Sequence, residues 1–424
     1  MKTLIATLFL LAFVLTGCTP SEPQIAQPML LYVPAVAAAP AALEPQPNFA
    51  RLTLKIELGG YTPARLEPSS GVLAGAYIKR DFLSPSIRAF ENSLGVSHAI
   101  YAYSMTLGDD FPLRWILENI AAMKTPLITI HPNERGFDTD ALQELAHNAA
   151  RFNVPIFINL FPLTADSNFL PSGYIAFFRY AHRLFAQHAP NAAIVWSLDA
   201  ESLPVSRQFY PGRDYVDWIN LIIYNPVSAL GEFRDFFSYV DVFNTMFQRE
   251  RPLMITTAVS HYTTENNAYF SQEAADFITH IYSRLADYPR IKAIIYQNYD
   301  EMHPGMARHA RFAQNYMINA VAQIQAAYTA AVSNSRFLPV LPSPAPPAST
   351  AIRIRSPFPA ITYYGFFYIP RHALVYDLRL GGIEALAGRE AIFYEREYYN
   401  MVDLNEIFGM DFFINAHEGF LVLR

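Results

Sequence analysis

The chain has 424 residues, of which 52% are hydrophobic and 16% are charged, so it can bury a large core and is not disordered as a whole. Its formal net charge of -6 excludes binding to nucleic acid through a basic face, because neutralising phosphates needs clustered Lys and Arg. Cys18 is the only cysteine, which excludes a disulfide within one molecule.

The N-terminus has the pattern of an export signal. Residues 1–18, MKTLIATLFLLAFVLTGC, place Lys2 before an apolar run that is too short for a comfortable membrane span. The ending LTGC resembles a bacterial lipobox, in which the chain is cut before Cys18 and the thiol is acylated. The alternative is an ordinary signal peptide that happens to contain a cysteine. We predict an exported protein that a lipid on Cys18 anchors to the bacterial cell membrane or envelope.

Residues 51–330 alternate short apolar runs with longer amphipathic segments, which is typical of βα units around a parallel sheet. The predicted strands span 72–78, 98–103, 126–131, 154–160, 192–198, 216–224, 252–258 and 291–298. Segments between these strands have apolar residues at helical spacing, as in DALQELAHNAARF after the third strand. Eight such units predict an α/β fold, a (β/α)8 TIM barrel, with its functional site at the carboxyl ends of the strands. A doubly wound open sheet is the competing fold, but no glycine-rich phosphate loop follows the first strand.

Two segments rich in Pro and Ala separate the predicted parts of the chain. Residues 19–50 are expected to form a semi-extended tether, and residues 331–350, which contain LPVLPSPAPPAST, a linker. The remaining residues, 351–424, combine short aromatic-rich strands with a helix, VDLNEIFG, closed by Gly409. They predict a small α+β module.

The barrel resembles glycoside hydrolase family 26, the β-mannanases and related endoglycanases. The most specific stretch is YPGRDYVDWINLIIYNP (210–226), and GAYI, FPLRWI, TPLITI and RPLMIT support it in the same order as in the family. The resemblance implies a retaining glycosidase with one glutamate at the end of the fourth strand and one at the end of the seventh. Such an enzyme uses one carboxyl group as acid and the other as nucleophile, about 5–5.5 Å apart.

The last module resembles the stalk-like domains related to the N-terminal domain of copper amine oxidases, through FFYIPRHAL and YYNMVDLNEIFGMDFFINAHEGFLVL. The resemblance does not imply copper, since His372 and His417 are a poor set of soft ligands. It implies an adhesive module that contacts cell-wall components.

The two glutamates of the family are absent from the chain. No Glu follows the fourth predicted strand, where the residues run from Asn159 to Asn168 with Asp166 as their only acid. At the end of the seventh strand the position falls on Thr257 or Ala258, and the nearest acid is Glu265. Neither the Thr257 side chain nor the Ala258 side chain can act as a carboxylate nucleophile. We therefore expect a catalytically degenerate barrel.

Polar and aromatic residues nevertheless follow several strands. The candidate ligand-binding residues are His131, Glu134, Asp199, Glu201, Tyr210, Tyr224, Asn298 and Asp300. If the chain is active, the candidate acids are Asp199, Glu201, Asp300 and Glu301, with Glu134 as a further partner across the mouth. The competing interpretation is that these residues are solvated or cap turns. Trp196 and Trp218 lie on predicted strands and are expected in the core.

No cofactor and no metal are expected. His131, His261 and His303 could gather beside a carboxylate, but no tight metal-binding spacing connects them. The sequence thus predicts a lipoprotein whose glycosidase-like barrel binds a cell-envelope or extracellular polysaccharide without cleaving it. The alternatives are an active glycosidase with relocated carboxylates and a purely structural envelope protein.

Overall fold

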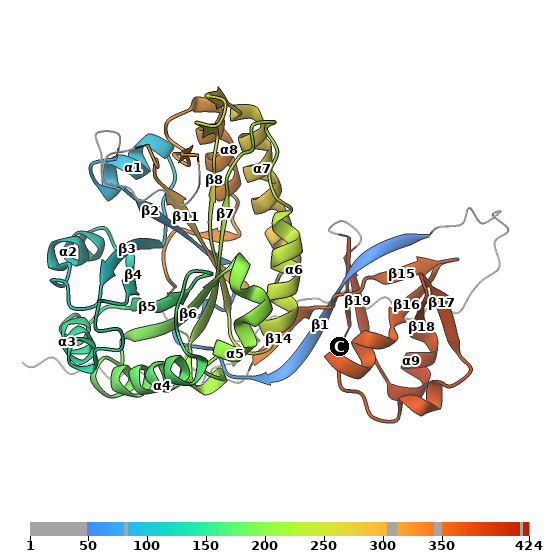
Figure 1. The fold of residues 1–424 in the computed structure, drawn as a ribbon. Helices are drawn as coiled ribbons and strands as arrows, with labels where there is room; N and C mark the ends of the chain where they lie inside the picture. The colour runs from blue at the N-terminus through green and yellow to red at the C-terminus, as the bar shows by residue number, and fades with distance from the viewer. Residues whose placement is uncertain (1–48, 80–83, 303–311, 343–349, 416–418, 424) are drawn as a thin grey trace, which may run out of the picture. The chain divides into compact units, whose positions relative to one another are not determined.

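The computed structural model describes residues 49–79, 84–302, 312–342, 350–415 and 419–423. The predicted export signal, with Cys18, and most of the tether lie outside these ranges. Within them, eight parallel strands pair in the order β11-β8-β7-β6-β5-β4-β3-β2, and β11 pairs with β2 to close a barrel (Figure 1). The barrel strands are β2 (Val72–Ile78), β3 (Ile100–Thr106), β4 (Thr125–His131), β5 (Ile156–Leu163), β6 (Ala192–Asp199), β7 (Trp218–Asn225), β8 (Leu253–Val259) and β11 (Ile291–Asn298).

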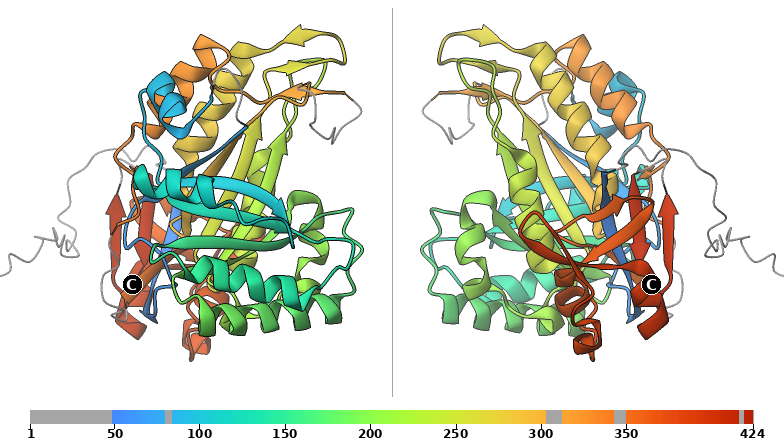
Figure 2. Two further views of the ribbon diagram at one scale, coloured as in Figure 1. Left: turned by 90° about the vertical axis from the view of Figure 1, so that its left-hand side faces the viewer. Right: turned by 90° about the vertical axis from the view of Figure 1, so that its right-hand side faces the viewer.

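Helices follow most of these strands and lie outside them, as both views of Figure 2 show. They are α1 (Ile87–Leu94), α2 (Leu113–Ala121), α3 (Thr139–Ala150), α4 (Pro171–His188), α5 (Ser206–Phe209), α6 (Phe236–Phe247), α7 (Ser271–Arg284) and α8 (Ala322–Val332), with short 3₁₀ turns at η1 (Ala200–Val205), η2 (Arg213–Tyr215) and η3 (Leu285–Asp287). Helix α1 shows how local residues set the two ends of a helix. The Ser86 side chain accepts a hydrogen bond from the Ala89 amide at the start of α1, and Gly95 ends it at φ 70°. The predicted TIM barrel is confirmed.

Successive side chains of each barrel strand point alternately into the barrel and towards the helices, which divides the core into an inner layer and an outer layer. Trp218, Phe157 and Met254 belong to the group of buried residues inside the barrel, with the Trp218 and Phe157 rings 5.4 Å apart. Trp196 belongs to the layer between strands and helices, where its ring lies 5.5 Å from that of Phe247 on α6. Both tryptophans are therefore core residues, as expected.

A second, mixed sheet is built by the C-terminal module. Its strands run in the order β17-β18-β16-β15-β1-β20-β19, and β14 also pairs with β1. They are β1 (Ala50–Tyr61), β14 (Thr350–Arg355), β15 (Ala360–Tyr363), β16 (Phe366–Pro370), β17 (Glu390–Phe393), β18 (Arg396–Asn400), β19 (Phe412–Asn415) and β20 (Phe420–Leu423). The predicted helix is α9 (Met401–Phe408), and Gly409 closes it at φ 65°. Two further short helical turns are η4 (Ala373–Asp377) and η5 (Ile383–Leu386).

Two observations differ from the expected boundaries of the barrel at residues 51 and 330. Strand β1 pairs with β14, β15 and β20 of the second sheet, because alternate residues such as Leu54 and Ile56 are buried in that sheet's own core. At the other end, α8 continues to Val332, and β13 (Phe337–Leu338) pairs with β2 of the barrel. The barrel therefore runs past residue 330, and β1 is part of the C-terminal sheet.

The carboxyl ends of the barrel strands are bordered by a small antiparallel sheet. It consists of β9 (Tyr262–Thr263), β10 (Ala268–Tyr269) and β12 (Gln314–Asn315). Across the described ranges, every helix is too short or too polar to cross a bilayer.

Candidate functional site at the barrel mouth

Strand β8 brings Thr257 and Ala258 to the barrel mouth, where the family resemblance would place a glutamate. The Thr257 hydroxyl donates a hydrogen bond of 3.0 Å to the Ile223 carbonyl and accepts one of 3.0 Å from the Asn225 side chain. It is thus engaged within the wall between β7 and β8. Ala258 is fully buried beneath a group of tyrosines. The position offers a methyl group and no nucleophile.

The tyrosines around Ala258 come from four separate places in the chain. We call Tyr77, Tyr224, Tyr299 and Tyr316 the mouth tyrosines, since all four pack with Ala258 in one cluster. The ring centroids of Tyr299 and Tyr316 are 5.0 Å apart, and the Tyr224 ring lies 6.3 Å from each of them. Of these four residues only Tyr224 was predicted from the sequence, although Tyr77 and Tyr299 also stand at the ends of predicted strands.

The mouth tyrosines keep their phenol protons at neutral pH. Burial, and to a smaller extent the neighbouring Tyr77, Glu301 and Asp199, raise the pKa of Tyr224 to about 12. Burial likewise raises the pKa of Tyr77 above its ordinary value. Tyr77 and Tyr224 are half-buried, whereas Tyr299 and Tyr316 are buried, so the first two can offer neutral hydroxyl groups that donate hydrogen bonds to a ligand.

The two predicted acids that follow β6 have local partners. Asp199 caps η1: one of its carboxylate oxygens accepts from the Ser202 amide at 2.8 Å, and the other from the Ala165 amide at 2.9 Å. Glu201 is exposed and forms an ion pair with Arg234, with the carboxylate oxygen 2.6 Å from Nη1. The capping interpretation therefore describes Asp199 well.

The polar residues at and after the end of β11 accept hydrogen bonds from nearby backbone amides. The Asn298 side chain accepts from the Ile318 amide at 2.7 Å, and Asp300 accepts from the Met302 amide at 2.9 Å. Glu301 is 3% exposed and accepts from the Gln314 amide at 3.0 Å. Among the predicted acids, Asp199 and Glu301 are close enough for their charges to raise the pKa of Tyr224.

Three other predicted residues lie apart from the mouth tyrosines. The exposed His131 makes a 2.8 Å hydrogen bond with Ser104 at the end of β3, and Glu134 is exposed on the following loop. Tyr210 is not a mouth residue: its ring lies 5.1 Å from Trp196 and 5.4 Å from Phe247, in the layer between β6 and α6. Trp196 points towards the helices, and Tyr210, which follows α5, packs against it there and not at the mouth, where it was predicted.

Below the mouth, a belt of hydrogen bonds crosses the inside of the barrel. The belt joins neighbouring strands from β4 to β8 through Thr129, Asn159, Ser197, Asn220 and Thr256. Its donor–acceptor distances range from 2.6 Å between Ser197 and Asn159 to 3.2 Å between Asn159 and Thr129. The belt satisfies its polar groups internally, so it forms a rigid floor for the mouth. The belt was not predicted from the sequence, although single polar residues within apolar strands are a signal for it.

An open depression lies beside the mouth tyrosines. It is lined by Phe233, Arg234, Glu265 and Gln314, among others, and has a volume of about 400 Å³. Gln314 is two residues from Tyr316, and the charge of Arg234 acts on the Tyr316 hydroxyl. A ligand lying across the mouth tyrosines would therefore have room to continue past Arg234.

The described residues contain no group of three or more His, Cys, Asp or Glu arranged to hold a metal ion. His261 is 1% exposed, and burial lowers its pKa to about 4. His303 lies outside the described residues.

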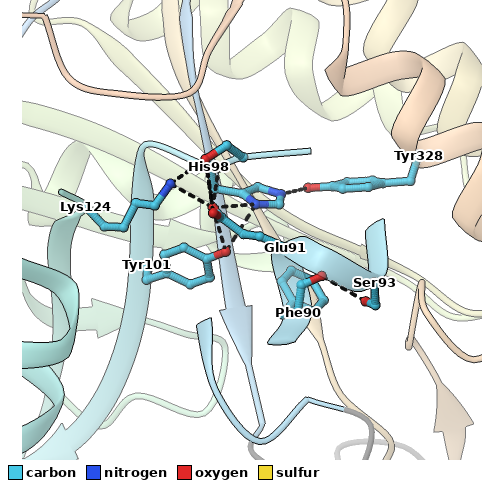
Figure 3. A network of polar contacts seen from close by, with 8 residues as sticks. Phe90, Glu91, Ser93, His98, Tyr101, Lys124 and Tyr328 are labelled. Carbon is cyan, nitrogen blue, oxygen red and sulfur yellow. Dashed lines mark hydrogen bonds and ion pairs between the residues drawn. The ribbon is translucent and has the colours of Figure 1, made fainter. Parts of the chain in front are cut away.

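A second polar cluster lies at the opposite end of the strands, since His98 is two residues before β3 and Lys124 one residue before β4 (Figure 3). Glu91 on α1 accepts from the His98 amide at 2.7 Å and from Tyr101 at 3.1 Å, and lies 2.8 Å from Lys124 Nζ. The His98 ring bonds Tyr328 on α8 at 2.8 Å. Buried groups at this end of a TIM barrel contribute to stability and not to catalysis.

The chain matches no protein-family profile and, at a significant level, no curated protein sequence. Among solved structures, it is similar to GH26C from a Muricauda species, with 12% identity and a TM-score of 0.46 over 65% of this chain and 91% of that one. It is also similar to a GH26 β-mannanase from Bacteroides ovatus, with 13% identity and a TM-score of 0.44 over 64% and 90% of the two chains. A GH113 β-1,4-mannanase gives 9% identity and a TM-score of 0.45 over 62% and 100%. Identities this low carry no information on activity.

Proposed function

We propose that the chain is a polysaccharide-binding protein whose TIM barrel holds a glycan at its mouth without cleaving it. The observation that carries the proposal is that Thr257 and Ala258, where the family resemblance would place the nucleophilic glutamate, supply no carboxylate, and that Ala258 is covered by the mouth tyrosines. A glycosyl-enzyme intermediate of the usual kind has no carboxylate oxygen on which to form at either residue.

The remaining chemistry of the mouth supports binding. Aromatic faces can pack against the C–H faces of sugar rings, and protonated phenols can donate to sugar hydroxyls. The carboxylates of Asp199 and Glu201 are occupied by backbone amides and by Arg234. The open depression beside Tyr316 leaves space for a chain longer than one sugar. Binding sites of this fold lie at this end of the strands.

The first prediction concerns Tyr224. Replacing it with alanine removes a ring face at the centre of the mouth, and we expect about a tenfold weaker affinity for a bound oligosaccharide. The measurement is titration calorimetry of the purified chain with soluble β-mannan and β-glucan oligosaccharides. A hydrolysis assay on the same oligosaccharides runs in parallel and should show no turnover.

The matched control is Tyr215→Ala, which removes another half-buried tyrosine, one that contacts Arg179 outside the mouth. This variant should bind as the parent does. Equal weakening by both variants, or no binding of any oligosaccharide by the parent, would refute the proposed mouth site.

An active glycosidase with relocated carboxylates is the second candidate, favoured by the proximity of Asp199 and Glu301 to Tyr224. This candidate predicts measurable turnover that Glu301→Gln abolishes, because one of the two required carboxyl groups is lost. Turnover of that kind would replace the binding proposal with an enzymatic one.

We also propose that the chain is exported and anchored through a lipid on Cys18. The apolar run before LTGC and the lack of any other cysteine support this. Metabolic labelling with a palmitate analogue should label the parent chain, and Cys18→Ala should abolish the label while a Ser21→Ala control keeps it. Labelling of the Cys18→Ala chain would contradict the anchor.

A further inference from the structure

Six arginines gather on one side of the barrel, away from the mouth, and we call them the arginine patch. Four of them are exposed and two are half-buried. They are spread over almost two hundred residues of the chain, so no run of basic residues predicts the patch. Its members are Arg65, Arg179, Arg183, Arg207, Arg213 and Arg251.

The turn that precedes β7 connects the members of the patch. Nε of Arg179 on α4 donates to the Pro211 carbonyl at 2.8 Å. Nε of Arg251 donates to the Arg213 carbonyl at 2.9 Å, from the segment that leads into β8. Arg183 follows Arg179 by four residues on α4, so the two lie on the same face of that helix. Three separate segments of the chain therefore bring their guanidinium groups to one place.

The charges of the patch act on the same two rings. Burial raises the pKa of Tyr210, and three arginines of the patch act against that rise. Burial lowers the pKa of His182, and three arginines of the patch lower it further. Arg251 belongs to both groups, so the two groups are neighbours. The first group is completed by Arg207 and Arg213, and the second by Arg65 and Arg183.

The carboxylates near the patch leave it positively charged. Asp217 is 8% exposed and accepts a hydrogen bond of 2.8 Å from the Ile194 amide, so its charge is held inside. A carboxylate oxygen of Glu250 lies 3.8 Å from Arg207, and Asp214 is exposed. Six guanidinium groups thus face three carboxylates, in a chain whose formal net charge is -6.

The patch lies at the end of the barrel opposite the mouth. Arg213 is five residues before β7, and Arg251 is two residues before β8, so both are at the amino ends of the strands. Arg183 and Arg213 are also available to a partner. Both are exposed, and within the described ranges their side chains make no hydrogen bond or ion pair.

We propose that the arginine patch docks the barrel onto an anionic phospholipid surface. Clusters of about four to eight Lys and Arg are typical of proteins that bind such surfaces. Guanidinium groups suit this partner because they bind phosphate oxygens through two parallel hydrogen bonds. A barrel docked through the patch keeps its mouth open to a glycan, because the mouth is at the other end of the strands.

The proposed lipid on Cys18 would hold the patch close to the membrane, where even a weak contact is occupied. The inference rests on that anchor only for the location of the membrane. The docking itself is tested on a chain without lipid, so that failure of the anchor and failure of the patch can be told apart.

The chain from residue 18 onwards, carrying Cys18→Ala, is sedimented with phosphatidylcholine vesicles that contain or lack phosphatidylglycerol. We expect binding only where phosphatidylglycerol is present. Binding should weaken as NaCl is raised from about 0.05 M to about 0.5 M, because salt screens the charges. Adding Arg183→Gln and Arg213→Gln should weaken it about 25-fold, since each arginine near such a surface contributes about fivefold.

The matched control is Arg88→Gln with Arg114→Gln, which removes two exposed arginines on α1 and α2 and changes the net charge equally. Its binding should equal that of the parent, and both double variants should keep the parent's melting temperature. Equal weakening by the two double variants would overturn the proposal, and so would binding without phosphatidylglycerol or no binding to either vesicle. Retention by insoluble polygalacturonate and not by vesicles would also overturn it, because the partner would then be an acidic polysaccharide.

Discussion

Replacing Arg290 by methionine is expected to lower the free energy of unfolding by about 3–5 kcal/mol, because it leaves a buried carboxylate without its partner. Arg290 is 1% exposed, and its Nη1 lies 2.7 Å from a carboxylate oxygen of Glu67, which is itself nearly buried. Its Nη2 donates to the Tyr61 hydroxyl at 2.6 Å, and Tyr61 in turn donates to Glu67 at 2.7 Å. Methionine fills part of the volume but supplies none of these donors.

Denaturation by urea, followed by tryptophan fluorescence, measures this effect in the barrel, where Trp196 and Trp218 lie. The matched control is Arg353→Met, since Arg353 forms an ion pair of 3.0 Å with Glu57 but is 46% exposed. An exposed pair contributes about 0–1 kcal/mol. Adding Glu67→Gln to Arg290→Met should recover part of the loss, because the unpaired charge is then removed. An Arg290 variant as stable as the Arg353 variant would contradict the prediction.

The barrel could be predicted from the sequence because its signals are local. Buried parallel strands are short apolar runs between amphipathic segments. All eight strands were predicted, and most of their predicted ends lie within about two residues of the observed ends. The pairing of β1 could not be predicted in the same way. Its partner Ile354 lies about three hundred residues along the chain, and alternation at Leu54 and Ile56 shows a half-buried strand without showing which sheet it joins.

The candidate site was predictable in part. Strand ends together with the family resemblance identify residues at a barrel mouth, which is how Tyr224, Thr257 and Ala258 were predicted to lie there. The sequence does not show which polar groups are already occupied. Asp199 is held by amides of two separate loops, and Glu201 by Arg234, more than thirty residues away. Tyr316 reaches the mouth from beyond β11, on a segment without a strand-end signal.

Glu91→Gln is expected to destabilise the barrel by about 2 kcal/mol at neutral pH, because it leaves the ammonium group of Lys124 buried without an anion. The side chains of Lys124 and Glu91 are 6% and 18% exposed, so solvent screens the pair in part. Burial works to raise the pKa of Glu91, but hydrogen bonds from His98 and Lys124 and the charge of Lys124 lower it to about 2, from an ordinary value of 4.5. The native state therefore favours the carboxylate.

The sign of this shift fixes the pH dependence. A carboxyl group whose pKa is lower in the folded state contributes stability above its unfolded value of 4.5 and loses it as the pH falls towards 2. The gap in unfolding free energy between the parent and Glu91→Gln should be full at pH 6 and close progressively below pH about 4.5. The control Glu273→Gln, at an exposed position on α7, should show little gap at any pH. The gap in unfolding free energy could instead stay constant from pH 6 down to pH 3. In that case the hydrogen bonds of Glu91, and not its charge, would stabilise the network.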